Sequence, residues 1–270
     1  MNSTTFAAQK QDERMKEILN QYEPITLDEM KNIRLMNRID TKFVTTLPML
    51  KQLLLLAQED YYVQETDNER ISPYHTVYFD TDDCEMYRMH ETGHTNRQKL
   101  RVRSYVSAGL SFLEVKTKNN HGRTKKKRVA AEGFDPEKCT LFDVRSSEYA
   151  DFLQTHLRYD PATLKEQVEN RFDRITLVNK GKTERLTIDT NVRFHNFVTE
   201  GYRFMDDIVI IELKRDGLMS SPILSKLLDL RIFPHGFSKY CIGSALTNDA
   251  LRRNRFKPRL HSIERMLGRE

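Results

Sequence analysis

The sequence lacks tryptophan and has only three cysteines, eight prolines and ten glycines among its 270 residues. The cysteines, Cys84, Cys139 and Cys241, are odd in number and far apart, which argues against a disulfide scaffold or a cysteine-based zinc site. The low glycine and proline content excludes collagen-like and low-complexity chains. No hydrophobic run approaches the roughly 20 residues of a membrane helix, and the N-terminus has no signal peptide. These absences predict a globular protein of the cytoplasm.

Charge is what the sequence has in abundance. Charged residues make up 31% of the chain, and 44 Lys and Arg against 39 Asp and Glu leave a net charge of +5. The basic residues are concentrated between Arg97 and Arg128. We therefore expect an anionic partner, such as a nucleotide, a phosphate polymer, a nucleic acid or a membrane surface.

The hydrophobic patterns predict more strands than helices. Strands are expected at 38–45, 74–80, 100–105, 111–118, 171–177, 185–193 and 203–215, and helices at 25–36, 48–57, 145–157, 221–230 and 241–255. Thr26 and Glu29 have the spacing of a capping box at the start of the first helix.

The organisation along the chain is simple, because no linker rich in proline, glycine or serine divides it. We expect one domain over residues 25–255, preceded by a polar N-terminal extension (1–24) and followed by a C-terminal tail (256–270). The predicted class is α+β with a mainly antiparallel sheet.

Five of the expected strands carry charged side chains on alternate residues, which places the charges on one face of each strand. The alternating sets are Arg38/Asp40/Lys42, Lys99/Arg101/Arg103, Glu114/Lys116/Lys118, Arg185/Thr187/Asp189 and Glu212/Lys214. An ordinary sheet with one wet face explains any single strand of this kind. Five of them favour a closed barrel, because like charges side by side repel unless they face a polyanion or interleaved carboxylates.

The lumen of such a barrel would be lined by lysine and arginine, and guanidinium groups match phosphate oxygens well. Three carboxylates, Glu114, Asp189 and Glu212, stand among these cations. They are candidates to hold a divalent metal, which phosphoryl chemistry normally needs.

Seven segments in this order resemble the VTC domain, the polyphosphate polymerase module of vacuolar transporter chaperone complexes. They are RIDTKF (38–43), YFDT (78–81), KLRVRSY (99–105), FLEVKTK (112–118), RLTIDT (185–190), IELK (211–214) and FSKY (237–240). The VTC domain is one of the triphosphate tunnel metalloenzymes, relatives of the CYTH group. The resemblance covers about residues 30–245 and implies a closed antiparallel β-barrel tunnel with a charged lumen and helices packed outside.

The resemblance also implies an activity, the transfer of the γ-phosphate of ATP to a growing polyphosphate chain with Mn²⁺ or Mg²⁺ as cofactor. By motif, the implied phosphate ligands are Lys42, Arg101, Arg103, Lys116, Arg171, Arg185, Lys214 and Lys239. Glu212 is the implied metal ligand, with Glu114 as a second candidate, and Ser238 and Lys239 lie at the mouth of the family's tunnel. Arg97 and Arg193 are added as candidates for polyphosphate binding. We expect no serine or histidine nucleophile, because positioning and charge neutralisation carry phosphoryl transfer.

The expected partners are therefore ATP and inorganic polyphosphate. No nucleic acid is expected, and membrane association would need a separate partner protein. Two alternatives stay open: hydrolysis of tripolyphosphate or nucleoside triphosphates at nearly the same site, and a non-catalytic module that binds polyphosphate or nucleic acid. A carboxylate such as Glu212 beside Lys214 speaks against pure polyanion binding, which gains nothing from it. The basic segment Arg123–Arg128 is interpreted as a loop that either guides the polyanion or is solvated.

Two motifs point elsewhere but fail on their context. The segment from His90 to His94 matches the zinc-hydrolase pattern H-E-x-x-H, but Gly93 weakens the helix that the pattern needs, and we expect a connector there. Gly181-Lys182-Thr183 is similar to the end of a P-loop, but Thr176 stands where that motif needs its first glycine.

Overall fold

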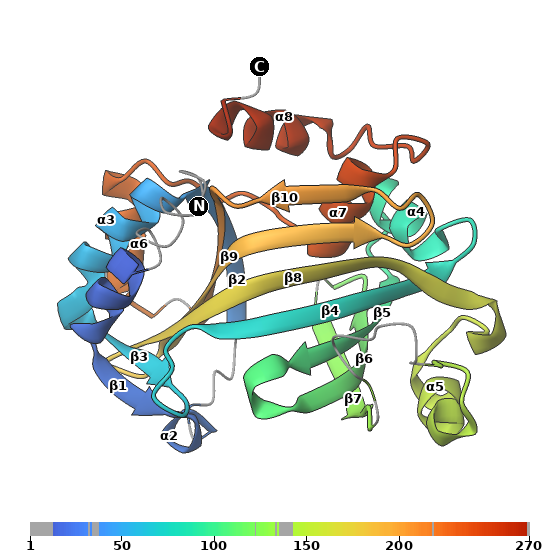
Figure 1. Cartoon of the computed structure of the whole chain (residues 1–270), viewed down its shortest axis with the longest axis horizontal. Helices are drawn as coiled ribbons and strands as arrows, with labels where there is room; N and C mark the ends of the chain where they lie inside the picture. Colours follow the sequence, from blue (N-terminus) through green and yellow to red (C-terminus); the bar gives the residue numbers. More distant parts are fainter. Residues whose placement is uncertain are drawn as a thin grey trace, which may run out of the picture.

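The computed structural model describes residues 13–31, 33, 38–121, 123–132, 134, 143–217 and 219–268. Eleven strands form one sheet (Figure 1). They are β1 (Glu23–Thr26), β2 (Arg38–Thr46), β3 (Tyr61–Glu65), β4 (Ser72–Thr81), β5 (Arg97–Tyr105), β6 (Leu110–Lys118), β7 (Thr124–Ala130), β8 (Leu164–Asn179), β9 (Glu184–Asn196), β10 (Tyr202–Met205) and β11 (Ile208–Asp216).

The main path of the sheet has the order β2-β11-β9-β8-β4-β5-β6-β7. Every pair along this path is antiparallel, while β10 is added to β9, β3 to β8, and β1 to β3 in parallel. The α+β class and the mainly antiparallel sheet predicted from the sequence are confirmed.

Helices pack around this sheet. They are α2 (Leu27–Lys31), α3 (Leu47–Ala57), α4 (Glu85–Glu91), α5 (Ala150–His156), α6 (Pro222–Asp229), α7 (Lys239–Thr247) and α8 (Lys257–Met266), and residues 13–20 are also helical. Short 3₁₀ turns occupy Gln58–Asp60, Val106–Ala108, Ser147–Tyr149 and Pro161–Thr163. Among the described helices, none combines the length and hydrophobicity that crossing a bilayer requires.

The sheet curls into a half-barrel that stays open along one side, so the prediction of a closed barrel is wrong (Figure 1). β2 and β7 are the two ends of the sheet, and no described residue pairs one with the other. The segment after α6 takes up part of the β2 edge, because the amide of His235 donates to the carbonyl of Lys42 at 2.7 Å.

Much of the outer face of the half-barrel is apolar and packs under helices. Over β2, β9 and β11, the fully buried Ile188 and Ile211 belong to one hydrophobic cluster with Leu50 of α3 and Ile223 of α6. Over β5 and β6, a second cluster joins buried strand residues such as Leu113 to α5. Each such side chain stabilises the fold by about 1.5–3 kcal/mol when it leaves water. This apolar face fixes which side of each strand faces the interior of the half-barrel.

α7 differs from the other helices because it lies against the inner face, at one end. The ring of Tyr240 on α7 stacks on that of Tyr78 on β4, with 5.1 Å between centroids. Gly243 lies so close to Phe194 of β9 that a Cβ atom there would stand 2.4 Å from the ring. Glycine is therefore required at position 243, and α7 closes this end of the half-barrel by direct packing.

The structure differs from the predicted element limits near both ends of the chain. Ile18 and Leu19, from the expected N-terminal extension, are buried in the core, and so are Leu260 and Ile263 of α8, from the expected tail. The capping box is present, since the amide of Thr26 donates to Glu29 Oε2 at 2.9 Å. The helix that it caps ends at Lys31, and positions 32 and 34–36 of the expected helix, like Cys139 and residues 1–12, lie outside the described residues.

Three further predictions on secondary structure need correction. The basic segment 123–128 is not a loop, because Thr124–Ala130 forms strand β7, in register with β6. The stretch 203–215, expected as one strand, is divided into β10 and β11 by a turn. The last predicted helix ends at Thr247 instead of Arg255.

Candidate functional site

The register of the sheet brings the charged side chains of separate strands onto one face. Residues opposite one another in neighbouring strands point to the same side. Lys42 lies opposite Glu212, Glu212 opposite Thr187, and Arg101 opposite Glu114. We call this concave face, together with the start of α7, the channel. Its central residues are Lys42, Lys99, Arg101, Arg103, Glu114, Lys116, Arg174, Arg185, Asp189, Glu212, Lys214 and Lys239.

Glu212 lies between two lysines in the channel. Lys42, from the neighbouring strand, donates to Oε1, and the Nζ of Lys214 lies 2.9 Å from Oε2. Burial acts to raise the pKa of the Glu212 carboxyl, but Lys214 and Lys42 outweigh it and hold the pKa well below its usual value. Glu212 is therefore ionised, and both of its oxygens face ammonium groups.

Asp189 connects the channel wall to α7. Arg174 of β8 binds both carboxylate oxygens, with Nε to Oδ1 at 2.6 Å and the second guanidinium nitrogen to Oδ2 at 2.8 Å. Lys239, the first residue of α7, also donates to Oδ2. Burial, with repulsion from Arg174 and Lys42, lowers the pKa of Lys239 to about 7 against the attraction of Asp189. A further anion beside this ammonium group would therefore stabilise its charged form.

Glu114 completes a third cluster of the same kind. Arg101 of β5 donates from Nε at 2.8 Å, and Lys126 of β7 donates to the other oxygen at 2.8 Å. The carboxylate has no exposed side-chain surface. Burial raises its pKa, but Arg101, Arg103 and Lys126 more than compensate and hold it at about 2. All three channel carboxylates are thus anions that keep pairs of cations in place.

The remaining channel cations have no carboxylate partner among the described residues. The Nε of Arg103 is buried without a hydrogen-bond partner. Desolvation within the channel, together with Arg101, Lys42 and Lys99, lowers the pKa of Lys116 to about 7. A buried donor without an acceptor costs about 1–3 kcal/mol. The channel therefore holds more positive charge than its own carboxylates neutralise, which favours binding of an anion with many oxygens.

Most of the residues implied by the sequence resemblance lie on the channel. Lys42, Arg101, Arg103, Lys116, Arg185, Lys214, Glu212, Glu114, Ser238 and Lys239 are brought together there. Ser238 caps α7, since its Oγ accepts from the amide of Cys241 at 3.2 Å, and it also accepts from Lys99 at 2.7 Å. Arg97 is on the same face of β5 but at its far end, where it lines a separate cavity of about 890 Å³ with Asp82 and Lys165.

Arg171 and Arg193 lie on the opposite, outer face, next to one another in the register of β8 and β9. Their side chains are 51% and 56% exposed. On β9, a bulge at Asn191, whose φ is +51°, reverses the alternation and turns Arg193 away from the side that Asp189 faces.

Arg174 is the channel arginine of β8, and our sequence reasoning missed it. The signal was present, because Ile175 and Leu177 are apolar and alternate with Arg174 and Thr176. Lys126 was also missed as a channel residue, because its strand was interpreted as a loop.

The H-E-x-x-H match does not form a zinc site. α4 ends at Glu91, so His94 lies beyond the helix and does not share a face with His90. His90 Nδ1 instead lies 2.9 Å from the thiol of Cys241, and Glu91 is buried with its Oε1 accepting from the amide of Arg255 at 3.3 Å.

The described residues hold no group of three or more His, Cys, Asp or Glu that would bind a metal by themselves. Glu212 offers a single carboxylate beside the channel lysines. Mg²⁺ in phosphoryl-transfer sites is commonly held by one or two carboxylates and by phosphate oxygens. The donor set therefore fits a divalent cation that arrives with a phosphate ligand, and does not fit a metal bound by protein alone.

Comparison with known families matches the VTC domain over residues 37–248. The chain belongs to the VTC domain family. The matched range runs from the start of β2 to the end of α7 and contains the whole channel. No curated protein sequence matches this VTC domain.

Several solved structures are similar to the VTC domain described here. A candidate adenylate cyclase from Bacillus halodurans has 14% identity and a TM-score of 0.48, covering 75% of this chain and 96% of that one. HpAC1, a candidate adenylyl cyclase from Hippeastrum with a dominant triphosphatase activity, has 14% identity and a TM-score of 0.48, covering 77% and 95%. The PH1819 protein from Pyrococcus horikoshii has 12% identity and a TM-score of 0.40, covering 75% and 93%. The family assignment rests on the match over residues 37–248.

Proposed function

We propose that this VTC domain is an ATP-dependent polyphosphate polymerase, which transfers the γ-phosphate of ATP to a growing polyphosphate chain in the channel. The observation that carries the proposal is the excess of cations over carboxylates on one concave face. Arg103 and Lys116 have no carboxylate partner among the described residues, and Lys239 has a lowered pKa. A triphosphate supplies oxygens to Arg103 and Lys116 and a second anion beside Lys239.

The cations position the substrate and neutralise charge. A terminal oxygen of the polyphosphate chain attacks the γ-phosphorus of ATP in line, the bond to the bridging oxygen of the β-phosphate breaks, and ADP leaves with that electron pair. Lys42, Arg101, Arg103, Lys116, Arg185, Lys214 and Lys239 bind the phosphates along this path. Donors fixed before the reaction stabilise the developing charge without reorganising.

The carboxylates hold the cations in place and link them to the cofactor. The ion pairs at Asp189 and Glu114 fix Arg174, Lys239 and Arg101 in position before substrate arrives. Bound Mn²⁺ or Mg²⁺ would add neutralisation at the phosphate oxygens, and Glu212 would be its protein ligand.

The proposal is tested by incubating the purified protein with ATP and Mn²⁺ or Mg²⁺. We expect long acid-labile phosphate chains and ADP. A Glu212→Gln variant should lose turnover by at least about 10³-fold while still binding polyphosphate, because the metal ligand is lost but the cations remain. Equal loss of turnover and of binding would contradict the role of Glu212. A wild-type protein that turns over neither ATP nor tripolyphosphate would exclude enzymatic function.

Hydrolysis of tripolyphosphate or a nucleoside triphosphate is the second candidate. The opening between β2 and β7 favours it, because water reaches a half-barrel more easily than a closed tunnel. In the same assay this activity would release only orthophosphate from ATP or tripolyphosphate, without chains.

A further inference from the structure

Three lysines of the channel lie directly opposite one another across neighbouring strands. Lys99 on β5 is the register partner of Lys116 on β6, and Lys116 is the partner of Lys126 on β7. Like charges in this arrangement destabilise a sheet. Of the three, only Lys126 has a carboxylate partner among the described residues. The row therefore costs stability in the empty protein, and a bound polyanion relieves that cost.

The row of Lys99, Lys116 and Lys126 begins beside Ser238 and Lys239 and leads out of the channel. The Nζ of Lys99 donates to Ser238 Oγ at 2.7 Å, beside Lys239 at the start of α7. From there two inter-strand steps of about 4.8 Å each lead to the edge strand β7. A chain of a few phosphates spans this distance.

A path in the other direction, beneath α7, is blocked by the packing of that helix. Beyond Lys239, the inner face is filled by the stacked rings of Tyr240 and Tyr78 and by the contact between Gly243 and Phe194. All four residues are buried, and none offers a cation to a phosphate chain. A polymer held at Ser238 and Lys239 therefore cannot continue beneath α7.

β7 offers cations outside the channel as well. Lys126 and Arg128 share the channel side of this strand, opposite Lys116 and Glu114, while Lys125 and Lys127 point to the other side. All four residues are exposed. In the described part of the chain, Lys125 and Lys127 have no ion-pair partner. We call the run Lys125–Arg128 the β7 rail.

We propose that the polyphosphate chain leaves the channel sideways, through the opening between β2 and β7, along Lys99, Lys116 and Lys126 and over the β7 rail. This inference rests on the proposed function, because it assumes that phosphate chains occupy the channel. The ligand is inorganic polyphosphate longer than the channel. A single-stranded nucleic acid is less suited to the rail, because residues 124–130 contain no aromatic side chain on which a base would stack.

The rail is tested with the double variant Lys125→Gln/Lys127→Gln, which leaves the channel side of β7 unchanged. Binding of tripolyphosphate and of polyphosphate of about 100 units is measured at several salt concentrations. We expect unchanged affinity for tripolyphosphate and an affinity for the long chain that is about tenfold lower, with a salt slope smaller by about 1.4, at about 0.7 per lost contact.

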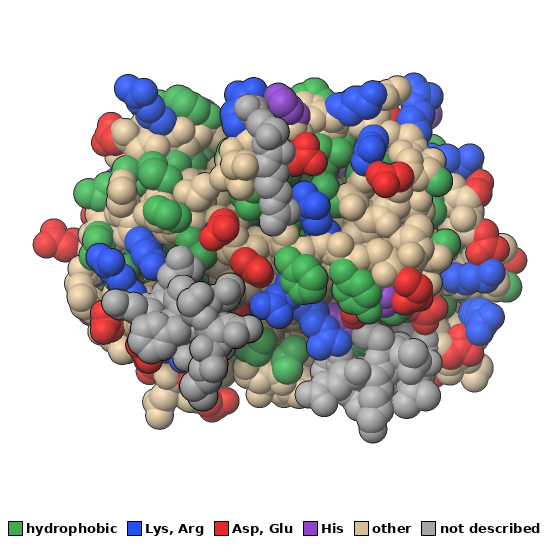
Figure 2. All heavy atoms as spheres, turned by 45° about the horizontal axis from the view of Figure 1, so that its top comes forward, with side chains coloured by type: hydrophobic (Ala, Val, Ile, Leu, Met, Phe, Trp, Pro, Cys, Tyr) green, Lys and Arg blue, Asp and Glu red, His purple; other side chains and the backbone are tan. Residues whose placement is uncertain are grey.

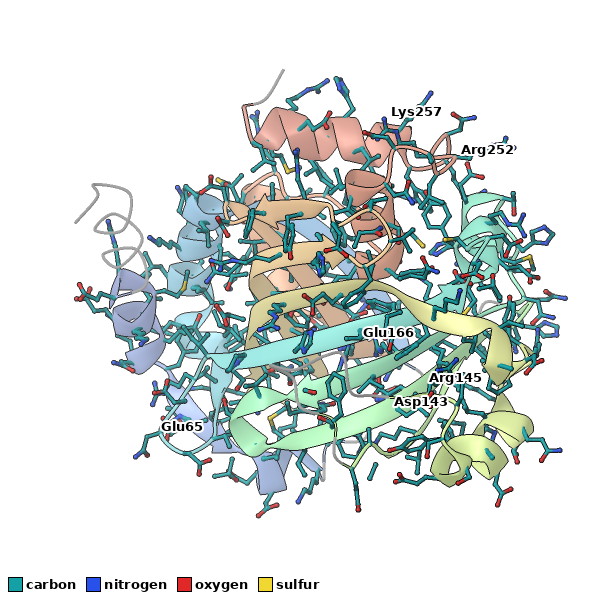
Figure 3. The ribbon with its side chains drawn as sticks, turned by 45° about the vertical axis from the view of Figure 1, so that its right-hand side comes forward. Glu65, Asp143, Arg145, Glu166, Arg252 and Lys257 are labelled. Atoms are coloured by element: carbon teal, nitrogen blue, oxygen red, sulfur yellow. The ribbon has the colours of Figure 1, made fainter. Side chains whose placement is uncertain are left out.

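The matched control is Lys51→Gln/Lys257→Gln, which makes the same change in net charge on α3 and α8. Lys257 belongs to α8 and lies at the top of Figure 3. In Figure 1, α8 lies at the top of the molecule and β7 in its lower half. The control should bind both ligands as the wild type does. Circular dichroism checks that all variants are folded, and the reversal Lys125→Glu/Lys127→Glu should weaken long-chain binding further.

Each other outcome contradicts the proposed path over the β7 rail. Equal weakening of tripolyphosphate and long-chain binding would show a general field effect, and long-chain binding no weaker than in the control would show that the chain takes another path. A single-stranded oligonucleotide that competes as well as polyphosphate in the wild type, but not in the variant, would make β7 a nucleic-acid surface. If the wild type bound no phosphate chain at all, the proposed function itself would fail, which is a different result.

Discussion

Arg171 and Arg174 stand three residues apart on the same strand and have different surroundings. Arg174 faces the channel, has a side chain only 13% exposed and binds both oxygens of Asp189. Arg171 faces the outside, where its side chain is 51% exposed and lies 4.0 Å from Glu169. Both are arginines on β8 in a chain rich in basic residues. The comparison teaches that the face of the sheet, and not the type of residue, decides which cations belong to the site.

The surface visible in Figure 2 also differs from the channel. There, outside the grey atoms, basic, acidic and hydrophobic side chains are intermixed, without a large patch of one sign. The channel, in contrast, gathers cations from β2, β5, β6, β8, β9, β11 and α7 around three carboxylates. The modest net charge of +5 therefore hides a strongly uneven distribution.

The different surroundings of the two arginines are tested most strongly by removing each arginine of β8 in turn. Arg174→Ala leaves Asp189 buried with only Lys239, and removing one partner of a buried ion pair costs about 3–5 kcal/mol. Arg171→Ala should change stability by less than about 1 kcal/mol, as is typical of exposed ion pairs. Urea unfolding followed by circular dichroism measures both. Similar losses in the two variants would contradict the assignment of faces.

A second comparison sets Arg103 against Arg193, one on each face. Arg103→Ala removes a channel donor without a carboxylate partner, and the loss of one such donor typically lowers the rate by 10²–10³-fold, or about 2.7–4 kcal/mol. The protein should stay folded, because no ion pair is broken. Steady-state turnover of ATP and of tripolyphosphate provides the measurement, and a rate within threefold of the wild type would exclude Arg103 from the site.

The dependence of binding on pH tests whether the channel lysines take up protons when phosphate binds. Lys116 and Lys239 have pKa values of about 7 in the empty channel, and a bound phosphate raises them. Binding therefore takes up protons above pH 7, so the affinity for tripolyphosphate should fall as the pH rises from 7 to 9, by up to about tenfold per pH unit for each proton. Calorimetry in buffers of different ionisation enthalpy counts these protons.

The control for this measurement is Lys116→Arg, which keeps a charge at all of these pH values. Its affinity should depend less steeply on pH, while the titration of the phosphate itself is common to both proteins. The same slope for variant and wild type would show that Lys116 does not titrate on binding.

The smallest effect is expected at Arg193. Its side chain lies outside the channel, near Asp206 at 3.6 Å and the ring of Phe204. Arg193→Ala should change stability by less than about 0.5 kcal/mol and turnover hardly at all. A loss of turnover comparable to that of Arg103→Ala would place a functional surface on the outside of the sheet.

Much of the site could be predicted from alternation alone, because a side chain's face depends on counting residues along a strand. That reasoning placed Lys42, Arg101, Glu114, Asp189 and Glu212 on one face, as the register shows. Counting does not carry past Asn191, because the bulge there adds a residue that no local pattern announces, and Arg193, an added candidate, lies on the outer face. Arg171 was carried over by motif, although the apolar neighbours of Arg174 gave the better signal.

That the barrel stays open could not be predicted, because closure depends on contacts distant in sequence. The edge of β2 is occupied by the backbone at Pro234 and His235, nearly 200 residues further along the chain. β7 was missed for a different reason. Four consecutive cations, Lys125–Arg128, give no apolar alternation, and only the pairing with β6 makes the segment a strand.

An edge strand with unsatisfied backbone groups is a template on which other molecules can assemble into larger sheets. Among the described residues, β7 is paired with a strand on one side only, and its lysines would face the lysines of a second β7 if two molecules approached edge to edge. Natural proteins use lysine at exposed edges to prevent this kind of aggregation. The cations of the β7 rail thus also hinder edge-to-edge association of the protein.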